Sequence, residues 1–196
     1  MSDDPLTAAE GAALTRLAVA TVADRLRGAG GGPPPPALAP LLAPGASFVT
    51  LTRGGRLLGC IGTLRAVRPL FLDVARNAAR AMRDPRLPPV TADDWPELDL
   101  SVAVLTPPEQ LAVDGREALL AALRPGVDGL LLTDGHRRAT FLPAVWEKLG
   151  EPARFLDHLL AKGGWQPGGW PDDLTVSRYR SVEFHDRAPR APLGTG

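Results

Sequence analysis

The sequence predicts an α+β fold in which an antiparallel or mixed β-sheet is flanked by helices. Strand and helix patterns alternate irregularly along the 196 residues, whereas a doubly wound parallel sheet requires regular alternation. Apolar runs are also joined in two places by dipeptides typical of tight hairpin turns, Gly54-Gly55 and Asp134-Gly135. No internal repeat is found, so a solenoid or propeller is not expected.

The amino-terminal segment is predicted to be a helix. Thr7 and Glu10 form a capping-box pattern, and apolar residues then recur at helical spacing to about Arg27. Residues 28–37 are rich in glycine and proline, which disfavours a packed element. We expect a surface loop there, with an interdomain tether as the alternative, followed by a short helix over residues 38–42.

Residues 47–64, SFVTLTRGGRLLGCIGTL, are predicted to form the central hairpin and contain the only cysteine, Cys60. With the Gly-Gly dipeptide as the turn, Cys60 is expected opposite Val49. Leu51 and Leu58 then share the face of Cys60, because side chains alternate along a strand. This register predicts an apolar environment for the thiol.

Glycines bracket the cysteine at both sides. A glycine inside a strand marks a bulge or the close approach of another backbone or a ligand. The segment GCIG therefore contributes candidate ligand-binding residues, Gly59, Ile61 and Gly62, on either side of Cys60.

The remaining elements follow from the same periodicity, proline and glycine signals. They are a helix over 69–82, a capped turn over 91–95, a strand over 98–105, a helix over 114–123, a hairpin over 129–142, helices over 143–150 and 152–162, and a last strand over 175–184. The tail over residues 188–196 is expected to be disordered.

Composition excludes several classes of protein. Lys+Arg and Asp+Glu both number 22, so no uniform attraction to nucleic acid or membrane is expected. A single cysteine forms no internal disulfide, and no stretch approaches the ~18 apolar residues that span a bilayer. A cytoplasmic location is the expectation.

Eight sequence blocks resemble the AMMECR family, whose prokaryotic members are also called AmmeMemoRadiSam system protein A. In chain order they are FVTL (48–51), GCIG (59–62), DPRLPPV (84–90), ELDLSVAVLTPPE (97–109), DGLLL (128–132), TFLPAVWEKLG (140–150), FLDHLLAKGGW (155–165) and YRSVEF (179–184). The resemblance implies one AMMECR-type domain over residues 1–187, with two unequal lobes and the GCIG motif near a cleft. It also implies two partners, a Memo-type protein similar to non-haem-iron dioxygenases and a radical SAM protein.

Cys60 is the candidate catalytic residue. A thiol is an effective nucleophile when a cation, a base or a helix amino end stabilises its thiolate. The family motif most often has arginine before Gly59, and this chain has Leu58 instead. Two interpretations stay open: a catalytic or ligand-contacting thiol, and a buried structural cysteine.

Six arginines are concentrated between residues 65 and 86: Arg65, Arg68, Arg76, Arg80, Arg83 and Arg86. They could form the rim of a pocket for an anionic ligand, a nucleic acid or an acidic partner. The alternative is a solvated helix face balanced by the acidic residues that follow. No aromatic residues are interleaved with them, which disfavours single-stranded nucleic acid.

Three further residues are candidates for ligand binding. Asp84 and Arg86 flank Pro85 in a block shared with the family, although a helix-terminating turn also explains them. His136 follows the Asp134-Gly135 turn and is expected to be exposed. No metal or cofactor is predicted, because HExxH, CxxC, P-loop and GxGxxG patterns in the required contexts are lacking.

These observations support two main hypotheses. The first is an enzyme or catalytic subunit that binds a small organic substrate in a cleft near the GCIG hairpin. The second is a non-enzymatic module that docks a protein partner. Nucleic-acid binding is a third and weaker hypothesis.

Overall fold

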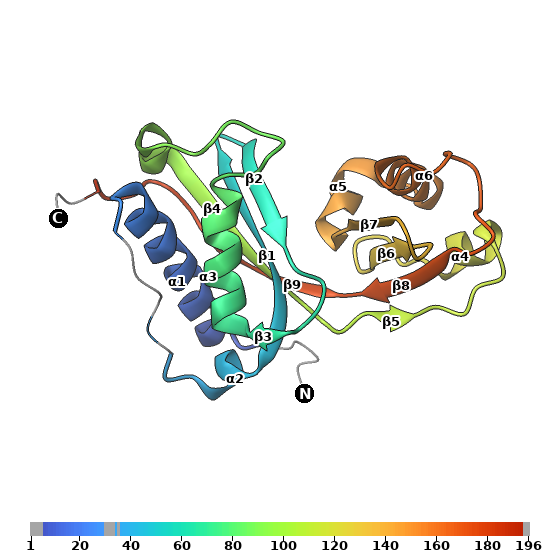
Figure 1. Ribbon diagram of the computed structural model, residues 1–196, viewed down its shortest axis with the longest axis horizontal. Coiled ribbons are helices and arrows are strands. Elements are labelled where there is room, and N and C mark those ends of the chain that lie inside the picture. Colours follow the sequence, from blue (N-terminus) through green and yellow to red (C-terminus); the bar gives the residue numbers. More distant parts are fainter. Residues whose placement is uncertain (1–5, 30–33, 35, 194–196) are drawn as a thin grey trace. The chain divides into compact units, whose positions relative to one another are not determined.

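The computed structural model describes residues 6–29, 34 and 36–193. The chain divides into two compact units. Unit 1 comprises residues 1–105 and 182–196, and unit 2 comprises residues 106–181. Each unit has its own sheet and its own hydrophobic core. Unit 2 is therefore an insertion between two strands of unit 1 (Figure 1).

Unit 1 is a sheet with two long helices on one face (Figure 1). Its sheet has the order β2-β1-β4-β9, and β3 pairs with the start of β1. In chain order the elements are α1 (Ala8–Leu26), α2 (Ala39–Leu42), β1 (Pro44–Arg53), β2 (Arg56–Gly62), β3 (Arg68–Pro69), α3 (Leu70–Ala81), a 3-10 helix (Ala92–Glu97), β4 (Leu98–Leu105) and β9 (Ser181–Asp186).

The sequence pattern explains which face of this sheet is covered. Alternate residues of β1 and β4, such as Val49, Leu51 and Val102, are fully buried and belong to the core beneath the helices. Helix α1 begins at the predicted capping box, with the Thr7 hydroxyl accepting from the Glu10 backbone N–H. The helix predicted over 69–82 is confirmed as α3, which buries one apolar face in the same core.

Unit 2 contains a smaller sheet with the order β5-β8-β6-β7. Its elements are β5 (Glu109–Gln110), α4 (Arg116–Ala122), β6 (Gly129–Thr133), β7 (Arg138–Phe141), a 3-10 helix (Pro143–Val145), α5 (Trp146–Leu149), α6 (Pro152–Lys162) and β8 (Thr175–Tyr179). The Trp146 ring stacks on Phe155 at a centroid distance of 3.9 Å in the core of this unit.

The predicted fold class is confirmed, since the strand pairings described within both sheets are antiparallel. The prediction of a single last strand over 175–184 is wrong, because the chain forms two strands there, β8 in unit 2 and β9 in unit 1. They separate at Arg180, whose carbonyl accepts from the Thr106 N–H and whose N–H donates to the Thr106 hydroxyl, both at 2.9 Å. These bonds hold the two crossing segments together where the strand changes sheet.

Two further expectations are corrected. The tail is not disordered over residues 188–193: the Ala188 N–H donates to Asp99 and the Arg190 guanidinium donates to the Leu98 carbonyl. The helix predicted over 114–123 begins later, because α4 starts after Gly115. No side-chain cap is formed at its start, although Asp114 precedes it. The loop predicted over 28–37 lies partly outside the described residues. In the described part of the chain, no helix is both long and apolar enough to cross a membrane.

Candidate functional site

The central hairpin contains a β-bulge that changes the predicted register. Arg53 pairs with Arg56 as expected, but the register shifts between Leu51 and Thr52. Cys60 therefore pairs with Thr50 instead of Val49. An extra residue in one strand moves every later side chain to the opposite face, and nothing in the Gly-Gly turn signals it.

This shift gives the thiol a different environment from the predicted one. Leu58, Val49 and Leu51 lie in the core under the helices, whereas Cys60 pairs with Thr50 on the opposite face of the sheet. The Thr50 hydroxyl donates a hydrogen bond to the Cys60 sulfur at 3.3 Å. The predicted apolar environment is thus wrong, and position 58 does not share the face of the thiol.

The backbone of Cys60 is held by Asp84 and Arg86. Strand β2 lies at the edge of the sheet, so backbone groups on its outer side lack a strand partner. The Cys60 N–H donates to Asp84 Oδ2 at 3.0 Å, and the Cys60 carbonyl accepts from Arg86 Nη2 at 3.1 Å. The Asp84-Pro85-Arg86 turn therefore takes the place of a neighbouring strand at this residue.

The same two side chains form a strong ion pair. Arg86 donates to both carboxylate oxygens of Asp84, with Nε–Oδ1 at 2.8 Å and Nη2–Oδ2 at 2.6 Å. The Asp84 carboxylate is fully buried, while the Arg86 side chain is 58% exposed. Hydrogen bonds from Arg86 hold the pKa of Asp84 well below its ordinary value, against the opposing effect of burial, and the same bonds raise the pKa of Arg86.

Each glycine of the GCIG segment lies against a different neighbouring group, which leaves no room for a side chain. A Cβ added to Gly59 would lie 1.9 Å from the carbonyl oxygen of Ala81 at the end of α3, so only glycine permits this contact. A Cβ on Gly62 would lie 2.2 Å from the ring of Phe48, which covers it from the paired strand. The predicted approach of another backbone is found at Gly59, whereas the group that approaches Gly62 is a side chain.

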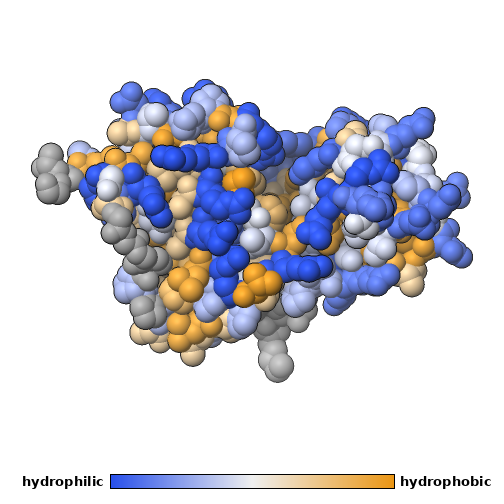
Figure 2. All heavy atoms as spheres, viewed as in Figure 1, coloured by the Kyte–Doolittle hydropathy of each residue, from blue (hydrophilic) through white to orange (hydrophobic). Residues whose placement is uncertain are grey.

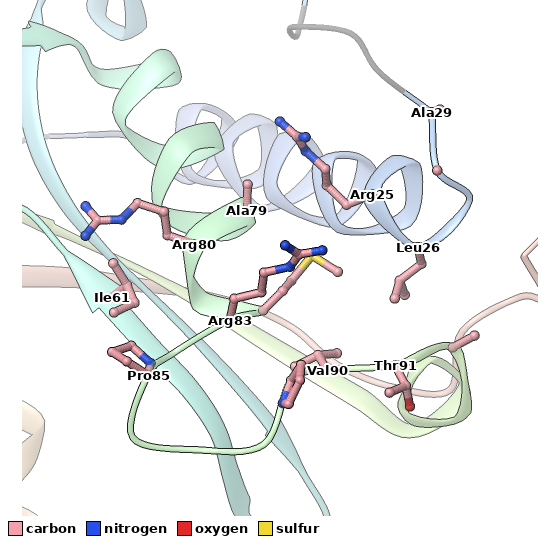
Figure 3. Close-up of a pocket in the computed structure, with 14 residues that line it drawn as sticks. Arg25, Leu26, Ala29, Ile61, Ala79, Arg80, Arg83, Pro85, Val90 and Thr91 are labelled. Carbon is pink, nitrogen blue, oxygen red and sulfur yellow. The ribbon is translucent and has the colours of Figure 1, made fainter.

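A cavity of about 800 Å³ opens beside the same strand, within unit 1. Its lining includes Ile61 of β2 and Pro85 of the turn that holds Cys60. The ends of α1 and α3 and residues 89–92 form the remaining wall (Figure 3). Cys60 is not among the lining residues, so the cavity and the thiol lie on different sides of the segment.

Three arginines line this cavity: Arg25 from α1, and Arg80 and Arg83 from the end of α3 (Figure 3). Figure 2 shows hydrophilic residues gathered over the exposed face of α3. The arginine-rich segment predicted at 65–86 thus contributes two lining residues, whereas Arg68 and Arg86 form ion pairs with Asp73 and Asp84. Sequence reasoning missed Arg25, because its position beside α3 depends on tertiary packing.

The predicted site residues are brought together only in part. Asp84 and Arg86 contact the GCIG segment at Cys60, through its backbone N–H and carbonyl. His136 belongs to unit 2, where it is exposed and its backbone N–H donates to Asp134. Within the described residues, no group of three or more His, Cys, Asp and Glu side chains is arranged to hold a metal ion.

The fold and this site define a class: α+β proteins of two units, in which a glycine-bracketed cysteine lies on an edge strand anchored by an Asp-Arg pair. The AMMECR1 family model matches residues 15–184. The chain belongs to the AMMECR1 family.

Individual relatives agree with this assignment. A protein of Methanothermobacter thermautotrophicus is 36% identical over 188 residues, covering 93% of this chain and 97% of the relative. Protein TK0174 of Thermococcus kodakarensis is 36% identical over 154 residues, covering 74% of this chain and 75% of the relative. The crystal structure of the uncharacterized protein PH0010 from Pyrococcus horikoshii is similar, with a TM-score of 0.87 at 30% identity, covering 96% of this chain and 97% of that one.

Proposed function

We propose that this protein binds a small organic substrate in the cavity beside the GCIG segment and acts as an enzyme or catalytic subunit. The observation that carries the proposal is the cavity itself. Its volume of about 800 Å³ lies within the range of roughly 300–1,000 Å³ typical of small-molecule sites. Its wall combines apolar side chains with a few cationic ones, which suits an organic molecule bearing a polar group.

Reactivity of Cys60 is a separate hypothesis, because Cys60 does not line this cavity. The Thr50 hydroxyl donates a hydrogen bond to its sulfur at 3.3 Å. The Arg86 guanidinium donates to the backbone carbonyl of Cys60 at 3.1 Å. Because the thiol faces away from the cavity, its chemistry is tested separately below.

Binding is tested with a variant that fills the cavity. Ala79 lines the cavity from α3, and Ala79→Phe places a ring in it. Leu72→Phe adds a similar ring at an exposed position of the same helix, outside the lining, and serves as the matched control. A panel of small neutral and anionic aromatic compounds is screened by thermal shift and by chemical-shift perturbation in NMR spectra.

We expect compounds that bind the wild-type protein and the Leu72→Phe variant, but not the Ala79→Phe variant. Binding that survives in Ala79→Phe would place the ligand elsewhere and contradict the proposal. The same conclusion would follow if no compound in the panel perturbed the resonances of Ile61 or Val90.

Docking of a protein partner is the second candidate function. Apolar side chains are exposed on three neighbouring segments of unit 1: Leu42 on α2 is 45% exposed, Val67 before β3 is 66% exposed and Leu72 on α3 is 39% exposed. The family resemblance suggests the Memo-type and radical SAM proteins as occupants. We expect co-elution with one of them in gel filtration, and its loss in Val67→Glu. Separate elution of the wild-type protein would reject this candidate.

A further inference from the structure

The rim of the cavity carries three cations and no lining carboxylate. Arg25, Arg80 and Arg83 are all exposed lining residues, and no aspartate or glutamate lines the cavity. Like charges placed together around a concave surface repel one another and raise its positive potential. A bound anion would relieve this repulsion.

These arginines differ from others in the described chain, many of which form ion pairs. Arg86, Arg124 and Arg137 each pair with an aspartate at 2.6 to 2.8 Å. Among the described residues, no ion-pair partner is found for Arg25 or Arg83, nor for Arg80. Their guanidinium groups therefore have hydrogen-bond donors available for a ligand.

The helix ends indicate how much charge a ligand would carry. Helices α1 and α3 both end at the cavity, and a helix C-terminus carries roughly half a negative charge. Two such ends contribute about −1 in total against three guanidinium groups, which leaves about +2. A ligand with two negative charges would neutralise this excess.

The remaining wall of the cavity indicates the chemical character of the rest of the ligand. Leu26, Ile61, Met82 and Val90 supply apolar surface below the rim. Figure 3 shows Arg83 extending over the middle of the cavity, with Arg25 and Arg80 on either side. A ligand with an apolar body and a compact dianionic group matches both parts of this wall.

We propose that the cavity binds an organic phosphate monoester, with its phosphate contacted chiefly by Arg83 and flanked by Arg25 and Arg80. This inference rests on the proposed function and names its substrate class. A phosphate monoester is favoured because its oxygens match the fork of a guanidinium and because it carries nearly two charges at neutral pH.

The test compares three probes that share a phenyl ring and differ in charge: phenyl phosphate, phenyl sulfate and benzyl alcohol. Dissociation constants are measured by NMR titration at pH 7.5 and low salt. We expect phenyl phosphate to bind about tenfold more tightly than phenyl sulfate, since charge-assisted hydrogen bonds are lost with the second charge. At pH 5, below the second ionisation of the phosphate near 6, the two anions are expected to bind alike.

Variants test which arginines are involved. Arg83→Gln is expected to weaken phenyl phosphate binding about tenfold, with smaller losses in Arg25→Gln and Arg80→Gln. Arg76→Gln is the matched control, because Arg76 lies on the exposed face of α3 outside the lining. Its affinity for phenyl phosphate is expected to stay within about twofold of the wild-type value.

The outcomes of these experiments distinguish the phosphate inference from the proposed function. Equal affinities for phenyl phosphate and phenyl sulfate at pH 7.5, or equal losses in Arg83→Gln and Arg76→Gln, would overturn the phosphate inference. Benzyl alcohol binding that Ala79→Phe abolishes would then leave the proposed function intact. If none of the three probes bound and the wider panel also failed, both proposals would be rejected.

Discussion

The two faces of strand β2 are constrained in different ways. On the helix-covered face, Gly59 lies against the backbone of Ala81 and Ile61 packs on the core. On the opposite face, Cys60 and Gly62 contact the side chains of Thr50 and Phe48. Backbone contacts leave little room to adjust, whereas side chains can rotate. The first face therefore fixes the position of the strand, and the second can change its chemistry without changing the fold.

The largest expected effect is on stability and distinguishes the two glycines of the motif. Gly59→Ala places its Cβ 1.9 Å from a backbone oxygen, and we expect it to lower the free energy of unfolding by about 3 kcal/mol. Gly62→Ala requires the half-buried Phe48 side chain to turn about χ1, because its Cγ would lie 2.2 Å from the new Cβ, and we expect a loss of about 1 kcal/mol. Urea denaturation measures both. Equal losses would mean that the two faces are equally constrained.

The second prediction concerns the anchor of the strand. Asp84→Asn keeps an acceptor for the Cys60 N–H but removes the ion pair with Arg86, and we expect a loss of about 2 kcal/mol at pH 7. Because folding lowers the pKa of Asp84 from its usual 3.8, the carboxylate stabilises the fold above that pH. This stabilisation is lost as the pH falls through the lower, folded-state pKa.

The stabilities of the wild-type protein and Asp84→Asn should therefore begin to converge below about pH 4 and approach each other further as the pH falls. Arg76→Gln, which changes an exposed arginine on α3, is the control and should be close to the wild-type protein throughout. A difference between wild type and Asp84→Asn that stays constant down to pH 2 would show that the charge of Asp84 does not contribute.

The smallest expected effect is on the reactivity of the thiol. We expect native Cys60 to react with iodoacetamide, and Thr50→Val to slow the reaction about three- to fivefold at pH 7, because the hydrogen bond to sulfur is lost. Leu58→Arg introduces the residue more common in the family, but on the core side of the strand. Its rate should stay within about twofold of the wild-type rate.

Mass spectrometry after timed quenching measures these rates. Reaction of Cys60 only in urea would identify a structural thiol and end the nucleophile hypothesis. A large acceleration in Leu58→Arg would instead show that position 58 reaches the thiol, contrary to the register of the hairpin.

Local sequence signals predicted most elements but not their pairing. The capping box at Thr7 and the turn at Gly54-Gly55 lie where expected, because caps and turns depend on neighbouring residues. The bulge near Leu51 was not predictable in this way, since nothing in the Gly-Gly turn signals an extra residue in one strand. Because of this shift of one residue, the predicted register places Cys60 on the face of the sheet opposite to the one observed.

The candidate site was likewise predictable only where neighbouring residues in the sequence determine it. Asp84 and Arg86 were identified from their sequence block, and both contact the backbone of Cys60. Arg25 could not be identified, because only packing brings the end of α1 beside the end of α3. Proximity in sequence also suggested that Cys60 and Ile61 serve one site, whereas strand geometry directs adjacent side chains to opposite faces.

The insertion of unit 2 between β4 and β9 has a consequence for biosynthesis. Strand β4 leaves the ribosome long before β9, and the sheet of unit 1 stays incomplete until residues 181–186 emerge. Joining the ends of an unfolded segment of that length costs on the order of 4 kcal/mol in chain entropy. The hydrogen bonds between Thr106 and Arg180 close the insertion at its own ends. Folding of unit 2 therefore brings its two ends together, and β9 can then complete the sheet of unit 1.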